Sequence, residues 1–412
     1  MIALLLMSLL GMGADVITVD DDGPADYTTI ADALAASHPG DVITVAQGDY
    51  GPFIIDRAVS IVGTALDPLP RVTGYVLVKA SRATLAGLEF GVLVVTGASD
   101  RVVIDDCTMG KWVPITPLSE ALVVSACAEI IVSRCRIQGS QDWQQLGGAY
   151  STGDAVRVED SHVVFVDCEL TGGDGASDVG SSPYTQGYDG GAPLVVLDST
   201  VEIAGSRLKA GHGGYGAWGL SDMSGEGGHG LIAEHSTVVV RGSATDYVKA
   251  SFSLGQASPG FSALLTDGSS MVLSGVQFDD FVNSLDNSKF VHPANEPWLE
   301  IFGEDTPGAV RTIQLHGSGA GDELGILYLG FVDDLVQLPV LEAPLWLDPV
   351  HAQLILYVAV DPVFSLSLPL PASLDGLAGL TLDVQAVMVG QFSNLVPGTI
   401  IVTDPAPIVV RF

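Results

Sequence analysis

Val-Val-Ile-Asp-Asp-Cys-Thr-Met-Gly, residues 102 to 110, is the stretch that decides the fold, because its pattern returns along the chain. When the copies are aligned on the position of Cys107, apolar residues stand five and three positions before it and two positions after it. The copies are 19 to 38 residues apart, so a short constant segment alternates with segments of variable length. A tandem array of this kind is typical of a solenoid protein.

The aligned positions form columns of apolar residues. The Cys107 slot holds Leu88, Cys107, Cys135, Cys168, Ser206, Ser243 and Val276. Five positions earlier stand Ala83, Val102, Ile130, Val163, Val201, Val238 and Met271. Three positions earlier stand Leu85, Ile104, Val132, Phe165, Ile203, Val240 and Leu273. Two positions later stand Phe90, Met109, Ile137, Leu170, Leu208 and Phe278, and the irregular Ser243 copy offers Thr245.

Apolar residues at alternate positions are typical of β-strands, and helical repeats would need longer segments. We therefore expect a parallel β-helix in which each column stacks into an internal ladder, with strands about 4.8 Å apart. Stacked thiols point the same way and not at one another, so we expect Cys107, Cys135 and Cys168 to be free and buried. Cys127 precedes a column of small residues seven before the slot, and we expect it to be accessible. That column holds Ser81, Asp100, Ala128, Ser161, Ser199, Ser236 and Ser269.

The composition is that of a folded and strongly acidic protein. Of 412 residues, 47% are hydrophobic, which excludes a disordered chain. Acidic residues outnumber basic ones 49 to 16, giving a net charge of -33. This balance argues against nucleic acid or an anionic membrane as a partner. It is compatible with divalent cations and an extracellular setting, and it disfavours a polyanionic ligand unless a cation intervenes.

The first 14 residues predict export. Residues 2 to 14 are an apolar run that ends in small residues and is too short to span a bilayer as a helix. We interpret residues 1 to 14 as a signal peptide cleaved near Ala14, with a buried first strand as the alternative. The protein is then expected to be secreted or to lie on the cell surface of a bacterium.

The segment after the first expected strand is typical of a cap. Thr28 or Thr29 can start a short helix that places Ile30, Ala33 and Leu34 on one face. An amphipathic helix there would cover the open apolar end of a β-helix. The whole opening, ITVDDDGPADYTTIADALAASHPGDVITVAQGDY followed by AVSIVG, resembles that of bacterial right-handed parallel β-helix proteins of the pectin-lyase-like superfamily. The resemblance covers residues 16 to 283 and implies the fold. It implies no single activity, because the superfamily includes lyases, hydrolases, esterases and adhesins.

The remaining chain divides into Gly-rich insertions and a second all-β part. Insertions at 139 to 155, 172 to 191, 211 to 230 and 254 to 262 occupy one place in consecutive coils, so we expect them to stack into a lobe. They are similar to insertions in secreted planctomycete or myxobacterial proteins. We place the β-helix at 15 to 283, a linker at 284 to 297 and an antiparallel β-sandwich at 298 to 412. The stretch LDGLAGLTLDVQAVMV resembles the end of a small C-terminal domain of exported planctomycete proteins.

The lobe carries the candidate binding residues. Aromatic faces can stack on sugar rings, and carboxylates can bind hydroxyl groups or Ca²⁺. The candidate ligand-binding residues are Trp143, Tyr150, Tyr184, Tyr188, Tyr215, Trp218, His212 and His229. The candidate Ca²⁺ ligands are Asp174, Asp178, Asp189, Asp222 and Glu226. The alternative is that these aromatic residues only pack the lobe and that the acids form a solvated face.

Candidate catalytic groups are fewer. A polysaccharide lyase needs a base such as Arg136 or Arg207, but Glu169 lies between these residues in the repeat, which predicts an exterior salt-bridge ladder. In a second such column, Arg134 lies between Asp106 and Asp167. Paired acids suited to glycoside hydrolysis occur at 105 to 106 and 279 to 280, and Gly-His-Gly occurs at 211 to 213 and 228 to 230.

One outward column is apolar and needs a cover. Four positions before the slot stand Thr84, Val103, Ile131, Val164, Glu202, Val239 and Val272. The C-terminal part, a loop or a second chain could cover them. Two function classes stay open. The first is a non-catalytic surface scaffold that binds polysaccharide through the lobe. The second is a lyase or glycoside hydrolase acting on an acidic glycan, in which acids and a base would converge in a groove.

Overall fold

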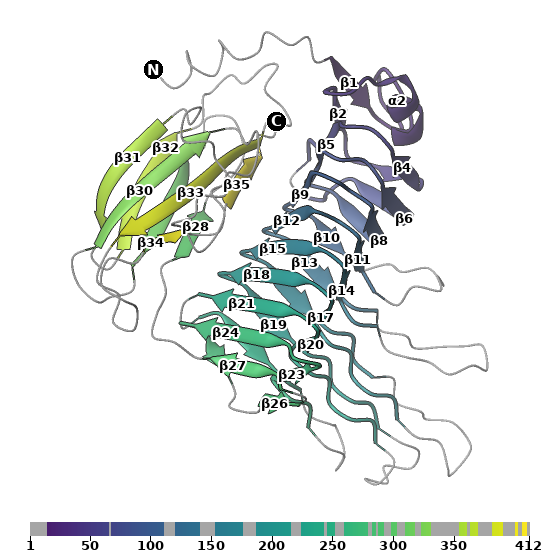
Figure 1. Ribbon diagram of the computed structural model, residues 1–412. Coiled ribbons are helices and arrows are strands. Elements are labelled where there is room, and N and C mark those ends of the chain that lie inside the picture. Colours follow the sequence, from purple (N-terminus) through teal and green to yellow (C-terminus); the bar gives the residue numbers. More distant parts are fainter. Residues whose placement is uncertain are drawn as a thin grey trace.

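The computed structural model describes residues 15–65, 67–110, 120–140, 153–175, 187–215, 224–242, 245–251, 259–278, 282–285, 287–291, 298–302, 310–317, 323–330, 354–360, 363–369, 381–389, 400–402 and 406–409. Residues 16 to 291 wind into a parallel β-helix (Figure 1), which confirms the fold expected from the repeat. The signal-peptide prediction lies outside the described residues. Within them, no helix is long and apolar enough to cross a membrane.

One face of the β-helix is an 11-stranded parallel sheet, here called the long sheet. Its strands, in order, are β1 (Val16–Val19), β2 (Val42–Val45), β5 (Ser60–Gly63), β7 (Ala83–Ala86), β9 (Arg101–Asp105), β12 (Glu129–Ser133), β15 (His162–Val166), β18 (Thr200–Ala204), β21 (Thr237–Arg241), β24 (Ser270–Ser274) and β27 (Lys289–Val291). The register pairs Val102 with Ile130 and Ile130 with Val163. The same pairing joins Ile104 to Val132 and Val132 to Phe165, so the columns five and three positions before the Cys107 slot are confirmed as ladders inside the β-helix.

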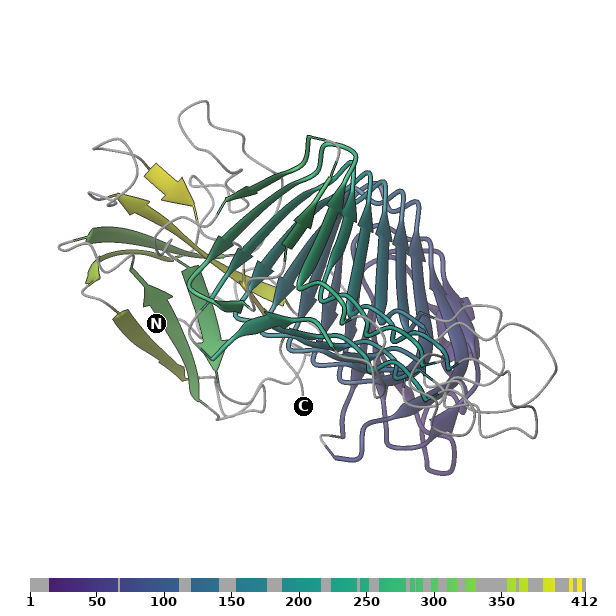
Figure 2. The ribbon, with the colours of Figure 1, turned by 90° about the horizontal axis from the view of Figure 1, so that it is seen from below.

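The rest of each coil belongs to a second sheet with two ladders, joined at β6 (Arg71–Val78) and β8 (Glu89–Thr96). The first ladder also contains β3 (Asp49–Tyr50), β10 (Thr108–Met109), β13 (Arg136–Gln138), β16 (Glu169–Thr171), β19 (Arg207–Lys209), β22 (Tyr247–Lys249) and β25 (Gln277–Phe278). The second also contains β4 (Phe53–Ile55), β11 (Leu122–Ser125), β14 (Val156–Glu159), β17 (Leu194–Leu197), β20 (Ile232–Glu234), β23 (Ala263–Thr266) and β26 (Val282–Ser284). Figure 2 shows the coils stacked along one axis.

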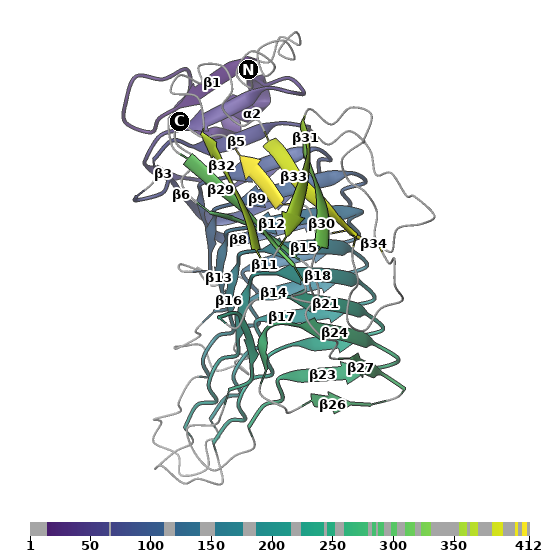
Figure 3. The same cartoon turned by 90° about the vertical axis from the view of Figure 1, so that its left-hand side faces the viewer.

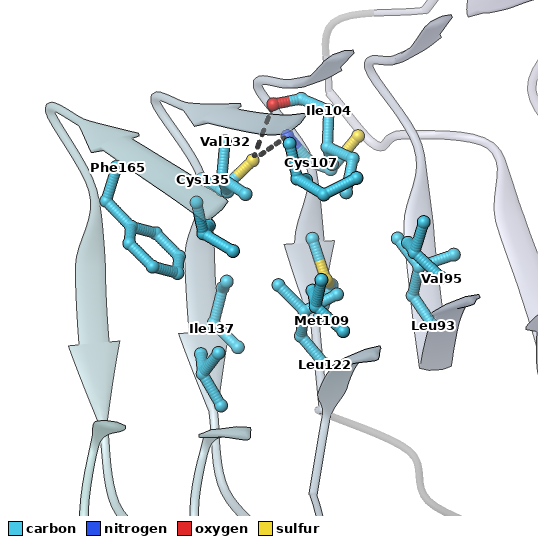
Figure 4. Close-up of a cluster of buried hydrophobic side chains, with 14 of the residues drawn as sticks. Leu93, Val95, Ile104, Cys107, Met109, Leu122, Val132, Cys135, Ile137 and Phe165 are labelled. Carbon is cyan, nitrogen blue, oxygen red and sulfur yellow. Dashed lines mark hydrogen bonds between the residues drawn. The ribbon is translucent and has the colours of Figure 1, made fainter. Parts of the chain in front are cut away.

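The Cys107 slot lies at the corner between the long sheet and the first ladder. The residue before it is left-handed in successive coils, with φ of 45° at Asp106, 51° at Arg134 and 52° at Asp167. Cys107 N–H donates to Cys135 Sγ at 3.4 Å, and the Cys135 thiol donates to the Ile104 carbonyl at 3.6 Å (Figure 4). All four cysteines are free and buried, and burial raises the pKa of the Cys135 thiol well above its ordinary value. The thiol ladder is confirmed.

The prediction that Cys127 is accessible is wrong. Its side chain is 3% exposed, and its N–H donates to Ser161 Oγ at 3.0 Å. Ser161 N–H in turn donates to Ser199 Oγ at 3.0 Å, and Ser199 N–H donates to Ser236 Oγ at 3.1 Å. Cys127 therefore occupies the column of small residues, in which the aligned sequence had placed Ala128. Ala128 lies one position further along the turn, and the Ala128 N–H donates to the Ala98 carbonyl.

The predicted column two positions after the Cys107 slot needs one correction. In the irregular copy, Leu208 pairs with Val248 and Arg207 pairs with Tyr247, so Val248 and not Thr245 continues the column. Asp246, and not Ser243, therefore occupies the Cys107 slot in that coil. The alignment failed because this corner is longer than its neighbours, and an insertion at a turn leaves the strand register of a solenoid unchanged.

The N-terminal end is capped as predicted. Helix α2 (Ile30–Ala36) begins after Thr29, whose side chain accepts the Asp32 N–H at 3.1 Å. Its buried residues are Ile30, Ala33 and Leu34, and the helix contacts β1, β2 and β4. Apolar side chains on one helix face therefore seal the first coil from water.

The C-terminal strands form two antiparallel sheets, as expected for a β-sandwich. One sheet holds β28 (Trp298–Phe302), β29 (Val310–His316) and β32 (Val363–Pro369). The other holds β31 (Leu354–Val360), β30 (Glu323–Gly330), β33 (Thr381–Val389), β34 (Ile400–Val402) and β35 (Ala406–Val409). In Figure 3 these strands lie in front of the long sheet, where β28 contacts β18 and β35 contacts β12. In the outward apolar column, Ile131 and Val164 are fully buried, whereas Val239 and Val272 are half-buried.

Candidate functional site

The described roots of the Gly-rich insertions leave the β-helix between the two ladders as paired arms, an outgoing arm and a return arm in each coil. The arms are joined by a continuous series of backbone hydrogen bonds that alternates between them. Gly173 N–H donates to the Gly153 carbonyl at 3.1 Å, Gly191 N–H to Gly173 at 2.8 Å, and Gly211 N–H to Gly191 at 2.9 Å. Gly228 N–H then donates to the Gly211 carbonyl at 3.0 Å. The predicted stacking of the insertions is thus confirmed for their described roots.

Glycine is needed here because backbone meets backbone. A Cβ built on Gly191 would lie 2.3 Å from the Gly153 carbonyl oxygen, and one on Gly211 would lie 1.9 Å from the Gly173 oxygen. Both distances are far below van der Waals contact, and both neighbours are main-chain atoms. The glycines at the described roots of the lobe are therefore explained by the close packing of the arms.

Carboxylates on the arms accept N–H groups of the next coil. Asp174 Oδ1 accepts the His212 N–H at 2.8 Å, Asp189 Oδ1 accepts the Glu226 N–H at 2.7 Å, and Asp154 Oδ1 accepts the Ala192 N–H at 2.7 Å. Burial raises the pKa of the Asp154 carboxyl. Two of the candidate Ca²⁺ ligands, Asp174 and Asp189, are thus already engaged in holding neighbouring arms together.

The other candidate metal ligands are not brought together among the described residues. Glu226 is exposed, and Asp178 and Asp222 lie outside the described residues. In the described part of the chain, two other groups have ligand atoms close enough to share an ion. They are Glu234 with His235 and Asp267, and Asp20 with Asp21 and Asp22. Both groups are mostly exposed, and neither was predicted from the sequence.

The side chains of the two lobe histidines, His212 and His229, also contact polar groups of the next coil. His229 Nδ1 accepts the Phe261 N–H at 2.9 Å, and the two rings stack with centroids 5.5 Å apart. His212 Nδ1 lies 2.5 Å from Ser251 Oγ. Each Gly-His-Gly segment therefore combines close-packed glycines with an imidazole that connects two arms, which favours a structural role over a catalytic one.

Acidification is expected to break the His229 link. Burial lowers the pKa of His229, against the opposing effect of Glu226 and Asp189. The unfolded chain, with a His pKa of about 6.5, therefore takes up a proton before the folded one does. The stability that neutral His229 contributes is complete above about pH 6.5 and is lost as the pH falls toward the lowered folded value.

Hydrogen exchange at the Phe261 amide, corrected for the intrinsic rate, should therefore rise between about pH 7 and about pH 5. The control is His229→Asn, whose side-chain oxygen can accept the same N–H but does not titrate. An equal rise in the control would show that another group is responsible.

The candidate aromatic residues of the lobe are only partly described. Tyr188 is half-buried and Tyr215 is 46% exposed. Trp143, Tyr150, Tyr184 and Trp218 lie outside the described residues. A sugar-binding role for these side chains stays a prediction.

The salt-bridge ladder predicted along Arg136, Glu169 and Arg207 is confirmed for its first pair. Arg136 Nε donates to Glu169 Oε2 at 3.0 Å, and 71% of the Arg136 side chain is exposed. Arg134 donates to Asp105, whose side chain is fully buried. Because Asp105 is inaccessible, residues 105 and 106 cannot present two carboxylates to a substrate. The second acid pair, at 279 to 280, lies outside the described residues.

The outer face of the first ladder also carries a group that we call the basic strip, made of Arg207, Lys209, Tyr247 and Lys249. The register pairs Arg207 with Tyr247 and Lys209 with Lys249 on the adjacent strands β19 and β22. Lys249 Nζ lies 4.5 Å from the centre of the Tyr247 ring. Within the described residues, no carboxylate lies within ion-pair distance of Arg207, Lys209 or Lys249. This is a local excess of positive charge in a protein of net charge -33.

A pocket of about 430 Å³ opens beside the basic strip, at the corner between the long sheet and the first ladder. It is lined by Arg134, Cys135, Arg136, Asp167, Cys168, Glu169, Gly205, Arg207, Thr245 and Asp246, and by Ile301 of β28. Basic and acidic side chains therefore meet at one cavity that also has an apolar wall. Arg207 belongs both to this pocket and to the basic strip.

Arg136, Arg207 and Glu169 were predicted from the sequence, whereas Lys209, Tyr247 and Lys249 were not. The misaligned copy hid them, because with Val248 placed correctly, Tyr247 and Lys249 fall in the two outward positions that flank it. The sequence signal was present as two lysines in the same outward column. Ile301 had no such signal, since it comes from outside the repeat.

No protein-family model and no curated protein sequence matches this chain. Among solved structures, it is similar to the pectate lyase Pel9A, with 13% identity over 69% of this chain and 76% of that chain and a TM-score of 0.40. It is also similar to full-length tailspike protein 2 of an Escherichia coli O157:H7 bacteriophage, with 10% identity over 84% of this chain and a TM-score of 0.33. This chain spans 61% of the length of that tailspike. The likeness concerns the fold alone, and the parallel β-helix is established by the strand topology.

Proposed function

We propose that this protein is a secreted or cell-surface scaffold that binds an acidic polysaccharide without cleaving it, through the basic strip on the first ladder. The observation that carries the proposal is the pairing of Lys209 with Lys249, next to Arg207, with no described carboxylate to neutralise them. Neighbouring strands are about 4.8 Å apart, and like charges placed opposite each other destabilise a sheet. A bound anionic chain would relieve that repulsion.

The overall charge supports this choice of site. A polyanion is repelled by most of a surface with net charge -33, so it can bind only where cations cluster. Guanidinium and ammonium groups form charge-assisted hydrogen bonds with carboxylate or sulfate oxygens. The Gly-rich lobe stays a second candidate surface through Tyr215, Trp143 and Trp218. The lobe carboxylates disfavour an anionic ligand there unless Ca²⁺ intervenes.

The double variant Lys209→Ala/Lys249→Ala is expected to bind polyuronate about tenfold more weakly than the wild type at low salt, because two ion pairs are lost. Affinity should fall further as salt is raised, since exposed charges are screened. The matched control is Lys79→Ala/Lys289→Ala, which removes the same charge from two exposed lysines elsewhere on the β-helix. Calorimetry on both variants measures the difference, and equal affinities would contradict the proposal.

A second candidate is a polysaccharide lyase, favoured by Arg207, which forms no described ion pair and lies in a pocket with Asp167 and Asp246. An elimination reaction would release unsaturated uronate, which absorbs in the ultraviolet. Absorbance that grows with the wild type, with or without Ca²⁺, and disappears in Arg207→Ala would make the protein an enzyme. Polyuronate binding without such growth would support the scaffold.

A further inference from the structure

The pocket beside the basic strip has a wall that the repeat does not supply. Its β-helix side presents the exposed Arg207 and the half-buried Asp167, and its opposite side is closed by the buried Ile301 of β28. We propose that this pocket is a composite subsite for the terminal sugar of the acidic glycan, with the C-terminal strands forming part of it. This inference rests on the proposed function and adds which part of the glycan binds and where.

The chemistry of the lining matches one charged sugar residue. The Arg207 guanidinium presents a planar set of donors suited to bidentate binding of a carboxylate. The half-buried Asp167 carboxylate can accept hydrogen bonds from sugar hydroxyl groups. Ile301, which is 3% exposed, closes the apolar side of the cavity. The volume of about 430 Å³ lies within the range of roughly 300–1,000 Å³ that is typical of small-ligand sites.

The position of the pocket favours a chain end. Lys209 and Lys249 lie two residues further along their strands than Arg207 and Tyr247, so the basic strip leads from the lysines through Arg207 to the corner. At that corner β28 stands against the β-helix and contacts β18. A glycan that follows the strip toward the corner meets Ile301 there, so its terminal sugar enters the pocket and the sugars behind it lie on the strip.

The first test uses the full chain and two kinds of probe, monomeric galacturonate and polygalacturonate of graded length. Bound protein per glycan chain should stay constant as the chain lengthens, because the number of ends does not change. Binding that grows in proportion to chain length would overturn the inference but would leave the proposed function intact. Polygalacturonate that does not bind at all would overturn the proposed function itself.

The second test blocks the pocket. Thr245 is exposed and lines the cavity, so Thr245→Phe adds a ring to the cavity lining without disturbing the core. The ring should hinder the contact between the sugar carboxylate and Arg207. Galacturonate should therefore bind about tenfold more weakly to this variant, which is the effect of losing one hydrogen bond to a charged group. Thr245→Ser, which keeps the hydroxyl group, should retain the affinity of the wild type. Unchanged galacturonate affinity in Thr245→Phe, with an unchanged denaturation midpoint, would show that the pocket is not used.

Discussion

Asp105→Ala is expected to lower the free energy of unfolding by about 3–5 kcal/mol, the cost of removing one partner from a buried ion pair. The Asp105 side chain is fully buried on the outer face of the long sheet, where it accepts from Arg134 and from Ser133 Oγ at 2.5 Å. Without the carboxylate, the Arg134 guanidinium, 16% exposed, keeps its charge and loses this partner. Chemical denaturation of the full chain should show the loss as a lower midpoint.

Two controls separate burial from charge. Arg82→Ala removes a partner from the exposed Arg82–Asp100 pair, whose side chains are 62% and 41% exposed, and should cost about 1 kcal/mol or less. Asp105→Ala/Arg134→Ala removes both buried charges and should be less destabilised than Asp105→Ala alone. A midpoint for Asp105→Ala equal to that of Arg82→Ala would show that water reaches this site.

Gly211→Ala is expected to cost about 3 kcal/mol or more, because overpacking costs about 1–3 kcal/mol and each lost buried hydrogen bond adds about 1 kcal/mol. The new methyl group would meet the Gly173 carbonyl oxygen at 1.9 Å and its carbon at 2.4 Å. Neither atom can move without disturbing Gly191, whose N–H donates to the same carbonyl at 2.8 Å. The arms should separate around residue 211.

Hydrogen exchange on the arms, together with the denaturation midpoint, measures this effect. Gly51→Ala is the matched control, since a Cβ there meets no atom within 4 Å and the glycine is exposed. It should be neutral or slightly stabilising, by up to about 1 kcal/mol. Similar exchange in both variants would mean that the arms are not close-packed. If Gly211→Ala still binds polyuronate, the lobe is excluded as the main binding surface.

The repeat made the β-helix predictable because each coil contacts only its neighbours. The columns of Val102 and Ile104 could be read directly, since residues that stack must share their chemistry. Cys127 and Thr245 were misplaced for one reason, which is that turns of different length shift the alignment without shifting the strands. Only hydrogen bonds, such as that from Cys127 N–H to Ser161 Oγ, reveal the true column.

The candidate site was less predictable than the fold. Asp174 and Asp189 were sensible metal ligands by residue type, but the structure engages both with backbone N–H groups of the next coil. A glycine arm forms no regular strand, so its N–H groups need partners that a pattern does not name. The sequence predicted the Arg136–Glu169 ion pair but not that Arg207, in the same column, forms no described ion pair, because a column gives the register of the side chains and not the distance between them.

By itself, the sequence determined the coil, the internal ladders, the helical cap and the free thiols, because these depend on local periodicity and on contacts between successive repeats. Only the tertiary structure decided that Lys209 and Lys249 are neighbours without a described carboxylate, and that Ile301 lies beside Arg207. These contacts depend on variable loops and on segments outside the repeat. An irregular turn hid the lysine pair in the sequence, and the place of Ile301 follows no period because it arises from the shape of the folded chain.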